Sequence, residues 1–252
     1  MADLSRYADW TAWLTARAED DPDVRCLWVG GSAATGGYDE WSDLDVVALC
    51  TPGTSYAAYD RWLAGVRTDF DVRDVWEVPT GTWPDGRQCF VNLQDRPGLL
   101  LEPTRLVDLV LLDLADQHSH LDVRRHGTPV VLHDPDSLLV LEEEDVSTTL
   151  TAAVEQVRQR RVTGEWLVNR AVARGHLSEA VDLYLRFPLA GVVRLLRVEH
   201  CPWRHDYGLR YLRDDLPEEV AARIEELVPG ATSATLEELS LRCFAWLDEL
   251  LT

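Results

Sequence analysis

Val29-Gly30-Gly31-Ser32, followed by Trp41-Ser42-Asp43-Leu44-Asp45-Val46-Val47, is the stretch around which the rest of the chain can be interpreted. The apolar run from Val24 to Val29 predicts a strand that stops at a glycine turn. Backbone N–H groups at such a turn, with the Ser32 hydroxyl, can donate hydrogen bonds to phosphate oxygens. In a strand, residues i and i+2 share one face, so Asp43 and Asp45 converge. Paired carboxylates suit a hard cation such as Mg²⁺.

Each of these two signals also has an ordinary structural explanation. Glycines end many strands, and an Asp-x-Asp at a strand start is often a turn aspartate beside a solvated neighbour. The turn lacks the lysine of a P-loop and the spacing of a dinucleotide-binding fingerprint. A third signal is therefore needed to choose between a site and a plain strand connection.

Asp108 supplies that third signal. It lies within Leu106-Val107-Asp108-Leu109-Val110-Leu111-Leu112, which reads as a strongly apolar strand. A charge in such a strand is costly unless it is paired, hydrogen-bonded or bound to a metal. The alternative is a structural aspartate bonded to backbone or arginine, and three other acidic residues compete for the same role: Asp71, Asp74 and Asp113.

The two halves of the chain differ in pattern. Up to about residue 136 short strands mix with helices, whereas from Ser147 onward apolar residues recur at helical spacing. Leu138 to Leu141, together with Glu142-Glu143-Glu144-Asp145, reads as a linker. We therefore predict an α+β protein with a mixed sheet flanked by helices in residues 1–145 and an all-α domain in residues 146–252. Helices are expected over 148–174, 178–186, from Pro188 to about Val198, 207–213, 217–227 and 235–250, with a further short strand at 99–102.

The formal charge of the 252-residue chain is −20, and all 24 of its basic residues are arginine. Such an acidic field repels nucleic-acid phosphates and anionic membranes. It attracts cations, whether metal ions or polyamine-like small molecules. An adaptation to solubility or to a salt-rich cell explains the charge equally well.

The five cysteines are scattered and form no Cys-x-x-Cys pair, so a disulfide framework or a structural zinc site is not expected. The start of the chain lacks the basic and apolar regions of a signal peptide. No apolar run approaches the ~18 residues of a membrane span. These features predict a cytoplasmic protein with reduced thiols.

Taken together, the order of the three signals resembles the nucleotidyltransferase superfamily of DNA polymerase beta type. Within it, the chain is most similar to the aminoglycoside adenylyltransferases, especially the streptomycin 6-adenylyltransferase group. The resemblance spans nearly the whole chain. The sequence differs from that group at Ala33, where the group has Arg, and at Arg210 and Arg213, where the family usually has Lys. The resemblance is carried by Asp43-Leu44-Asp45, Leu106 to Leu111, Pro129 to Asp136, Trp166-Leu167-Val168, Ala173-Arg174-Gly175 and Leu209 to Glu219.

The resemblance implies transfer of AMP from ATP to a hydroxyl of an aminoglycoside or similar cationic amino-sugar, with release of pyrophosphate. Asp43, Asp45 and Asp108 would hold Mg²⁺, with two ions expected, and Asp108 would also take the hydroxyl proton. The nucleoside triphosphate would be held by residues from both halves of the chain: Gly31, Ser32, Arg210 and Arg213.

The acceptor-binding candidates in the helical half are Trp166 with Glu165, Glu179 with Asp182, and Trp203 with Asp206. Aromatic walls and carboxylates suit sugar rings and amines. Core packing for each tryptophan and a solvated helix face for Glu179 and Asp182 are the competing explanations.

Other functions stay open. The same chemistry could serve a lincosamide or a protein hydroxyl, and the fold could instead be a catalytically silent nucleotide-binding regulatory module. RNA tailing is disfavoured by the acidic charge and the absence of a basic stripe. A monomer or a homodimer is expected.

Overall fold

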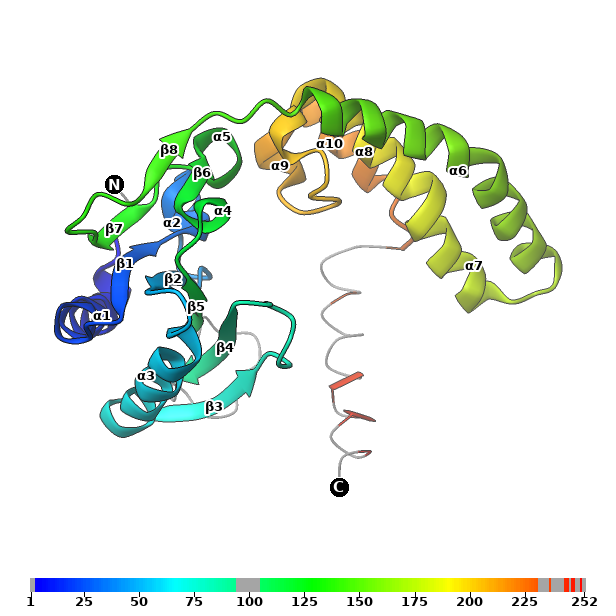
Figure 1. The fold of residues 1–252 in the computed structure, drawn as a ribbon. Coiled ribbons are helices and arrows are strands. Elements are labelled where there is room, and N and C mark those ends of the chain that lie inside the picture. Colours follow the sequence, from blue (N-terminus) through cyan, green and yellow to red (C-terminus); the bar gives the residue numbers. More distant parts are fainter. Residues whose placement is uncertain are drawn as a thin grey trace. The chain divides into compact units, whose positions relative to one another are not determined.

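The computed structural model describes residues 3–93 and 105–230, together with a few positions between 236 and 250. The chain divides into two compact units, Met1–Glu144 and Asp145–Thr252, and each is described by itself. Mixed strands and helices occupy the first unit and helices the second, which confirms the α+β prediction (Figure 1).

A six-stranded mixed sheet forms the first unit, in the order β3-β4-β5-β2-β1-β7. β2 and β5 run parallel, and the other neighbours pair antiparallel. The strands are β1 (Val24–Val29), β2 (Leu44–Cys50), β3 (Val72–Glu77), β4 (Gly86–Leu93), β5 (Leu106–Asp113) and β7 (Val130–His133). The predicted strand at 99–102 lies outside the described residues.

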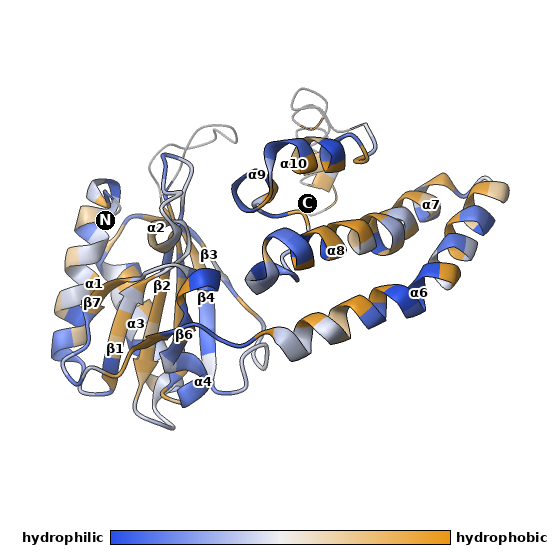
Figure 2. Cartoon of the chain, turned by 90° about the horizontal axis from the view of Figure 1, so that it is seen from above, coloured by the Kyte–Doolittle hydropathy of each residue, from blue (hydrophilic) through white to orange (hydrophobic). Residues whose placement is uncertain are grey.

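One face of the sheet is covered by α1 (Ala8–Asp20) and α3 (Ser55–Asp69). The 3₁₀ turn η1 (Ser5–Tyr7) precedes α1. Alternate residues of the central strands, such as Val46 and Leu109, are buried against helix residues that include Trp10 and Trp62. Figure 2 shows β1 and β2 as predominantly hydrophobic. This face supplies the main core, and it takes every second residue of β2, β4 and β5.

The opposite face carries a smaller apolar cluster around Trp28, Leu49 and Val110. Short elements follow β5 along the chain: α4 (Asp116–Ser119), β6 (His120–Asp122), α5 (Val123–His126) and β8 (Val140–Glu142). The strands β6 and β8 pair in parallel. Because side chains alternate, this second face also receives the polar residues of the central strands, Asp45 and Asp108 among them.

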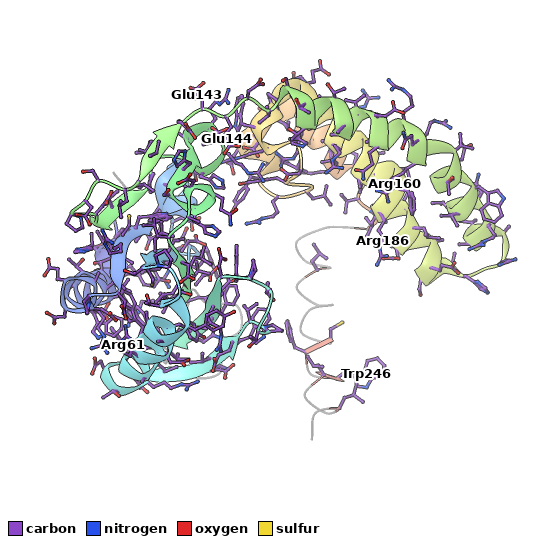
Figure 3. All side chains as sticks on the ribbon, in the orientation of Figure 1. Arg61, Glu143, Glu144, Arg160, Arg186 and Trp246 are labelled. Atoms are coloured by element: carbon purple, nitrogen blue, oxygen red, sulfur yellow. The ribbon has the colours of Figure 1, made fainter. Side chains whose placement is uncertain are left out.

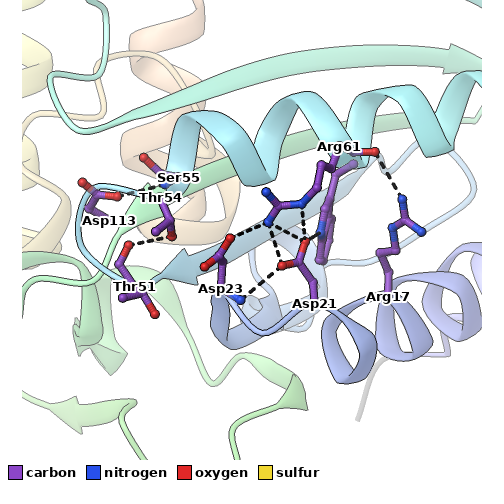
Figure 4. A network of polar contacts seen from close by, with 9 residues as sticks. Arg17, Asp21, Asp23, Thr51, Thr54, Ser55, Arg61 and Asp113 are labelled. Atoms are coloured by element: carbon purple, nitrogen blue, oxygen red, sulfur yellow. Dashed lines mark hydrogen bonds and ion pairs between the residues drawn. The ribbon is translucent and has the colours of Figure 1, made fainter.

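Two aspartates beside α3 have structural roles (Figure 4). Asp21 is buried and accepts hydrogen bonds from Arg61 and from the Trp62 indole at 3.1 Å. Asp113 accepts from the backbone N–H groups of Gly53 at 2.8 Å and Ser55 at 3.1 Å. Asp113, one of the rivals of Asp108, therefore holds the turn that begins α3.

The second unit is helical. Its elements are α6 (Ser147–Ala173), α7 (Leu177–Tyr184), the π-helical turn η2 (Leu185–Leu189), α8 (Ala190–His200), η3 (Pro202–Arg204), α9 (Leu212–Asp215) and α10 (Glu218–Glu225). The long helix α6 mixes hydrophilic and hydrophobic residues along its length (Figure 2). No described helix of either unit is long and apolar enough to cross a membrane.

Two helix predictions in this unit are wrong. Pro188 does not begin a helix but lies inside η2, which joins α7 to α8. The wider hydrogen-bonding pattern of a π-helical turn accommodates a residue without a backbone N–H. Residues 207–211 form turns, and Tyr211 takes a φ of +53°, so α9 begins only at Leu212. The predicted helix at 235–250 lies largely outside the described residues.

A buried charge cluster organises the end of this unit. Arg197 is fully buried and donates to Asp215 at 2.6 Å and to the Gly208 carbonyl at 2.8 Å. Arg204 donates to the second oxygen of Asp215 at 2.7 Å. This cluster fixes the irregular segment between α8 and α9, where regular backbone hydrogen bonds are few.

Replacing Asp21 by alanine tests the structural role of that carboxylate. We expect Asp21→Ala to lower the free energy of unfolding by about 2 kcal/mol at pH 7, because it leaves Arg61 and Trp62 without their acceptor. Burial raises the pKa of Asp21, but its hydrogen bonds with Arg61, Asp23 and Trp62 lower it below the ordinary value. The destabilisation should therefore shrink as the pH falls through that lowered pKa.

Urea denaturation followed by circular dichroism measures this loss. The matched control is Asp136→Ala, which removes an exposed ion pair with Arg25 and should change stability by less than about 0.5 kcal/mol. Equal stability of Asp21→Ala and wild type would contradict the assignment.

Candidate functional site

Asp45 and Asp108 are direct partners in the parallel pairing of β2 with β5. Partners in adjacent strands point to the same side of the sheet and lie about 4.8 Å apart along the hydrogen-bonding direction. Both are only partly buried, while their strand neighbours Leu44, Val46 and Leu109 are fully buried. The sheet thus places two carboxylates side by side on its second face, as the core takes the alternate residues.

Gly31 lies directly against the Asp45 carboxylate. A Cβ atom at Gly31 would stand 1.7 Å from Asp45 Oδ2, and the residue has a φ of +55°. The Gly30 N–H donates to the Asp45 carbonyl at 2.8 Å, which ties the turn to the start of β2. Only glycine fits this position, both because the conformation is left-handed and because the carboxylate fills the space of a side chain.

Ser32 and Ala33 follow in α2 (Gly31–Thr35). The Ser32 hydroxyl oxygen is buried and has no hydrogen-bond partner among the described residues. A buried hydroxyl without a partner is unfavourable, so it is suited to a ligand oxygen. Ala33 packs into the main core. The residue that differs from the adenylyltransferase pattern is therefore a buried core residue.

Gln88 of β4 orients the Asp108 carboxylate. Its amide donates to both oxygens of Asp108, at 2.7 and 3.0 Å, and accepts from the Trp83 indole at 2.9 Å. Sequence reasoning missed Gln88. Its only signal in the sequence was its position in the strand. Gln88 is a polar residue two positions before Phe90, on the opposite face from Cys89 and Val91.

The environment of Asp108 raises the pKa of its carboxyl above the ordinary value. Burial is the main cause, the Gln88 hydrogen bonds oppose it, and the negative charge of Asp43 adds to it. A carboxylate with a raised pKa is a stronger proton acceptor than an exposed one. The same face therefore holds an oriented, basic carboxylate next to Asp45.

Asp43 precedes β2 and is partly buried. Its charge also contributes to raising the pKa of Tyr7, which burial brings to about 12. Within the part of the chain that the structure describes, no group of three or more His, Cys, Asp or Glu side chains is gathered closely enough to hold a metal ion. The predicted ligand set of Asp43, Asp45 and Asp108 is therefore not assembled by these side chains as they stand.

The donors on this face nevertheless suit Mg²⁺. Magnesium is commonly bound through one or two carboxylates, with substrate phosphates and water completing its coordination. Asp45 lies between the glycine turn and Asp108. A phosphate bound at the turn would therefore lie next to the Asp45 carboxylate, and one Mg²⁺ could contact both.

Arg210 and Arg213, the predicted triphosphate ligands, belong to the helical unit. Arg213 forms an exposed, two-fold hydrogen-bonded ion pair with Glu225. Arg210 lies beside the rings of Tyr207 and Tyr211, at 5.9 and 5.2 Å from their centroids. Their role toward a nucleotide stays a prediction.

Arginine partners are already present at three of the predicted acceptor residues, Trp166, Glu179 and Asp182. The Arg170 guanidinium lies over the Trp166 ring at 4.8 Å and pairs with Glu179 at 3.5 Å. Asp182 pairs with Arg186 at 2.9 Å. Trp166 and Glu179 are thus brought together, but an arginine of the same unit occupies the position that an acceptor amine was expected to take.

A cavity of about 800 Å³ lies in the helical unit, lined by parts of α6, η2 and α8. Its walls carry several arginines, of which Arg160 and Arg186 are labelled in Figure 3. Two of the predicted acceptor-binding residues, Glu165 and Asp206, line it, whereas Trp166, Glu179 and Asp182 do not. All the residues that line this cavity belong to the helical unit.

Comparison with solved structures gives distant likenesses. No family model matches the chain, and no curated protein matches it. A solved structure of a CCA-adding enzyme in complex with CTP is similar over 96% of this chain and 74% of its own, with 12% identity and a TM-score of 0.34. A likeness of that size carries no inference, so the function is argued from the geometry of the site.

Gly31→Ala tests the contact between the turn and Asp45. We expect it to destabilise the protein by at least about 1 kcal/mol and to displace the Asp45 carboxylate, because the new methyl group overlaps it. Gly36→Ala is the matched control, since Gly36 has a φ of +86° but no atom within 4 Å of an added Cβ. Thermal unfolding and Mg²⁺·ATP titration compare the two. Equal behaviour would show that the Asp45 contact is unimportant.

Asp108→Asn tests the cost of ionising that carboxyl. The pKa of the Asp108 carboxyl is higher in the folded protein than in the unfolded chain. In the pH window between these two pKa values, the folded protein therefore binds more protons than the unfolded chain. Wild-type stability thus falls as the pH rises through this window, and the loss persists at pH 7. We expect Asp108→Asn to melt at a higher temperature than wild type at pH 7. The two should converge below about pH 4. A lower melting temperature for the variant at pH 7 would contradict this account.

Proposed function

We propose that this protein is a magnesium-dependent nucleotidyltransferase that moves AMP from ATP to a hydroxyl of a cationic amino-sugar compound such as an aminoglycoside. The observation that carries the proposal is the pairing of Asp45 with Asp108 on one face of the sheet, with Asp45 lying against the positive-φ Gly31. Carboxylates next to a glycine turn are parts that phosphoryl and nucleotidyl transfer can use.

In this proposal the Gly31–Ser32 turn receives the triphosphate. The partnerless Ser32 hydroxyl would donate to a phosphate oxygen. Asp43 and Asp45 would hold Mg²⁺, which neutralises charge on the triphosphate when bound.

Asp108 would act as the general base. Its raised pKa and the two hydrogen bonds from Gln88 give an oriented carboxylate that accepts the proton of the acceptor hydroxyl. The freed oxygen attacks the α-phosphorus of ATP, a P–O bond to AMP forms, and the bond to the departing pyrophosphate breaks. The products are the adenylylated acceptor and pyrophosphate.

The acceptor class is supported by charge. The chain carries a formal charge of −20, which favours the approach of a polycation and disfavours that of an anionic acceptor. Carboxylates on the second face of the sheet add a local negative field. A lincosamide or a protein hydroxyl stays the alternative acceptor.

Pyrophosphate release with Mg²⁺ and ATP, measured across an aminoglycoside panel that includes streptomycin and spectinomycin, tests the proposal. We expect release with at least one compound. Asp45→Asn and Asp108→Asn should each reduce the rate by about 10³-fold or more, because they remove a metal ligand and the base.

The matched control is Asp136→Asn, an exposed carboxylate paired with Arg25, which should keep wild-type turnover. Retained transfer by both site variants would overturn the roles of Asp45 and Asp108. Binding of Mg²⁺·ATP without transfer to any compound would favour a silent nucleotide-binding module instead.

A further inference from the structure

One row of side chains crosses four neighbouring strands on the second face of the sheet. Trp76 of β3 pairs with Phe90 of β4, Phe90 pairs with Asp108 of β5, and Asp108 pairs with Asp45 of β2. Directly paired residues project to the same side of a sheet. The row therefore consists of two aromatic rings followed by two carboxylates.

The aromatic half of this row is a stacked pair. The rings of Trp76 and Phe90 are 5.1 Å apart between centroids and inclined by only 14°. Trp76 is nevertheless 57% exposed. Such a large exposed ring, held in place by its neighbour, is a typical surface for binding the apolar face of a ligand.

Trp76 also differs from other aromatic residues of this chain. Guanidinium groups lie over the rings of Trp13, Tyr59 and Trp166, supplied by arginines of the same unit. Among the residues that the structure describes, no arginine lies over Trp76. Its ring is thus available to a cation from outside the protein, and the carboxylates of Asp108 and Asp45 continue the row beside it.

The strand order separates this aromatic pair from the glycine turn. Gly31 follows β1, on one side of the Asp45–Asp108 pair, whereas β4 and β3 lie on the other side. If the turn receives phosphates, the reacting phosphorus lies near the carboxylates and the second substrate approaches from β4. Phe90 is about one strand spacing, roughly 5 Å, from Asp108, and Trp76 about two.

We propose that Trp76 and Phe90 form the platform on which a ring of the cationic acceptor lies, with its reacting hydroxyl at Asp108. This inference rests on the proposed nucleotidyl transfer and names the acceptor side of the same site. The rings would contact the apolar face and the cationic groups of the acceptor ring, while Asp108 faces its reacting hydroxyl and Asp45 stays a ligand of Mg²⁺.

Calorimetric titration tests this platform with full-length protein and two ligands measured separately, Mg²⁺·ATP and each member of the aminoglycoside panel. We expect Trp76→Ala to weaken acceptor binding by about tenfold and to leave Mg²⁺·ATP affinity unchanged. Trp76→Phe, which keeps an aromatic face, should bind within about threefold of wild type. Tyr56→Ala removes another exposed aromatic ring, from α3 on the other face, and should bind both ligands as wild type does.

Each other outcome overturns the platform. Unchanged acceptor binding by Trp76→Ala would remove Trp76 from the acceptor site, and weaker Mg²⁺·ATP binding alone would make the pair a surface for the nucleotide base. If wild type binds Mg²⁺·ATP but no member of the panel, the platform for a cationic ring is wrong while the nucleotide site stands. If wild type does not bind Mg²⁺·ATP, the proposed function itself fails, whatever the acceptor result.

Discussion

The parallel pairing of β2 with β5 is the constraint on which the rest of the first unit depends. Its register places Asp45 directly beside Asp108, although these residues are far apart in the sequence. Every alternate residue of the two strands must enter the core under α1 and α3, so the polar residues have only the second face to occupy. A slip of one residue in either strand would bury a carboxylate and expose a core side chain.

The same residue type serves opposite purposes around this sheet. Asp21 and Asp113 are held by several hydrogen bonds that lower their pKa, despite the opposing effect of burial, so their charge stabilises the fold at neutral pH. Asp108 has fewer hydrogen-bond donors, and burial and Asp43 raise its pKa. Ionised Asp108 is therefore a burden on stability, which is a common property of residues that perform chemistry.

In the helical unit a buried charge cluster stabilises the irregular segment between α8 and α9. Arg197 and Arg204 share the two oxygens of Asp215, and Arg197 also binds backbone carbonyls of the irregular segment. The guanidinium group suits this task because it offers several donors in one plane. A chain whose basic residues are all arginine can use the same group for exposed pairs, as Arg213 and Arg186 do.

The sequence by itself determined the strands, their alternation, the change to helices after the acidic linker and the candidate carboxylates, because these depend on local periodicity and on the cost of a charge in an apolar strand. It failed where local rules were overridden, as at Pro188, and it gave no reason to single out Gln88 among the polar residues of β4. Only the tertiary structure decided that β5 lies between β4 and β2, because strand order depends on contacts between distant segments. That order places Gln88 next to Asp108 and aligns Trp76 and Phe90 with the two carboxylates. It also leaves Asp113 in a structural role, as the hydrogen-bond acceptor of the turn before α3.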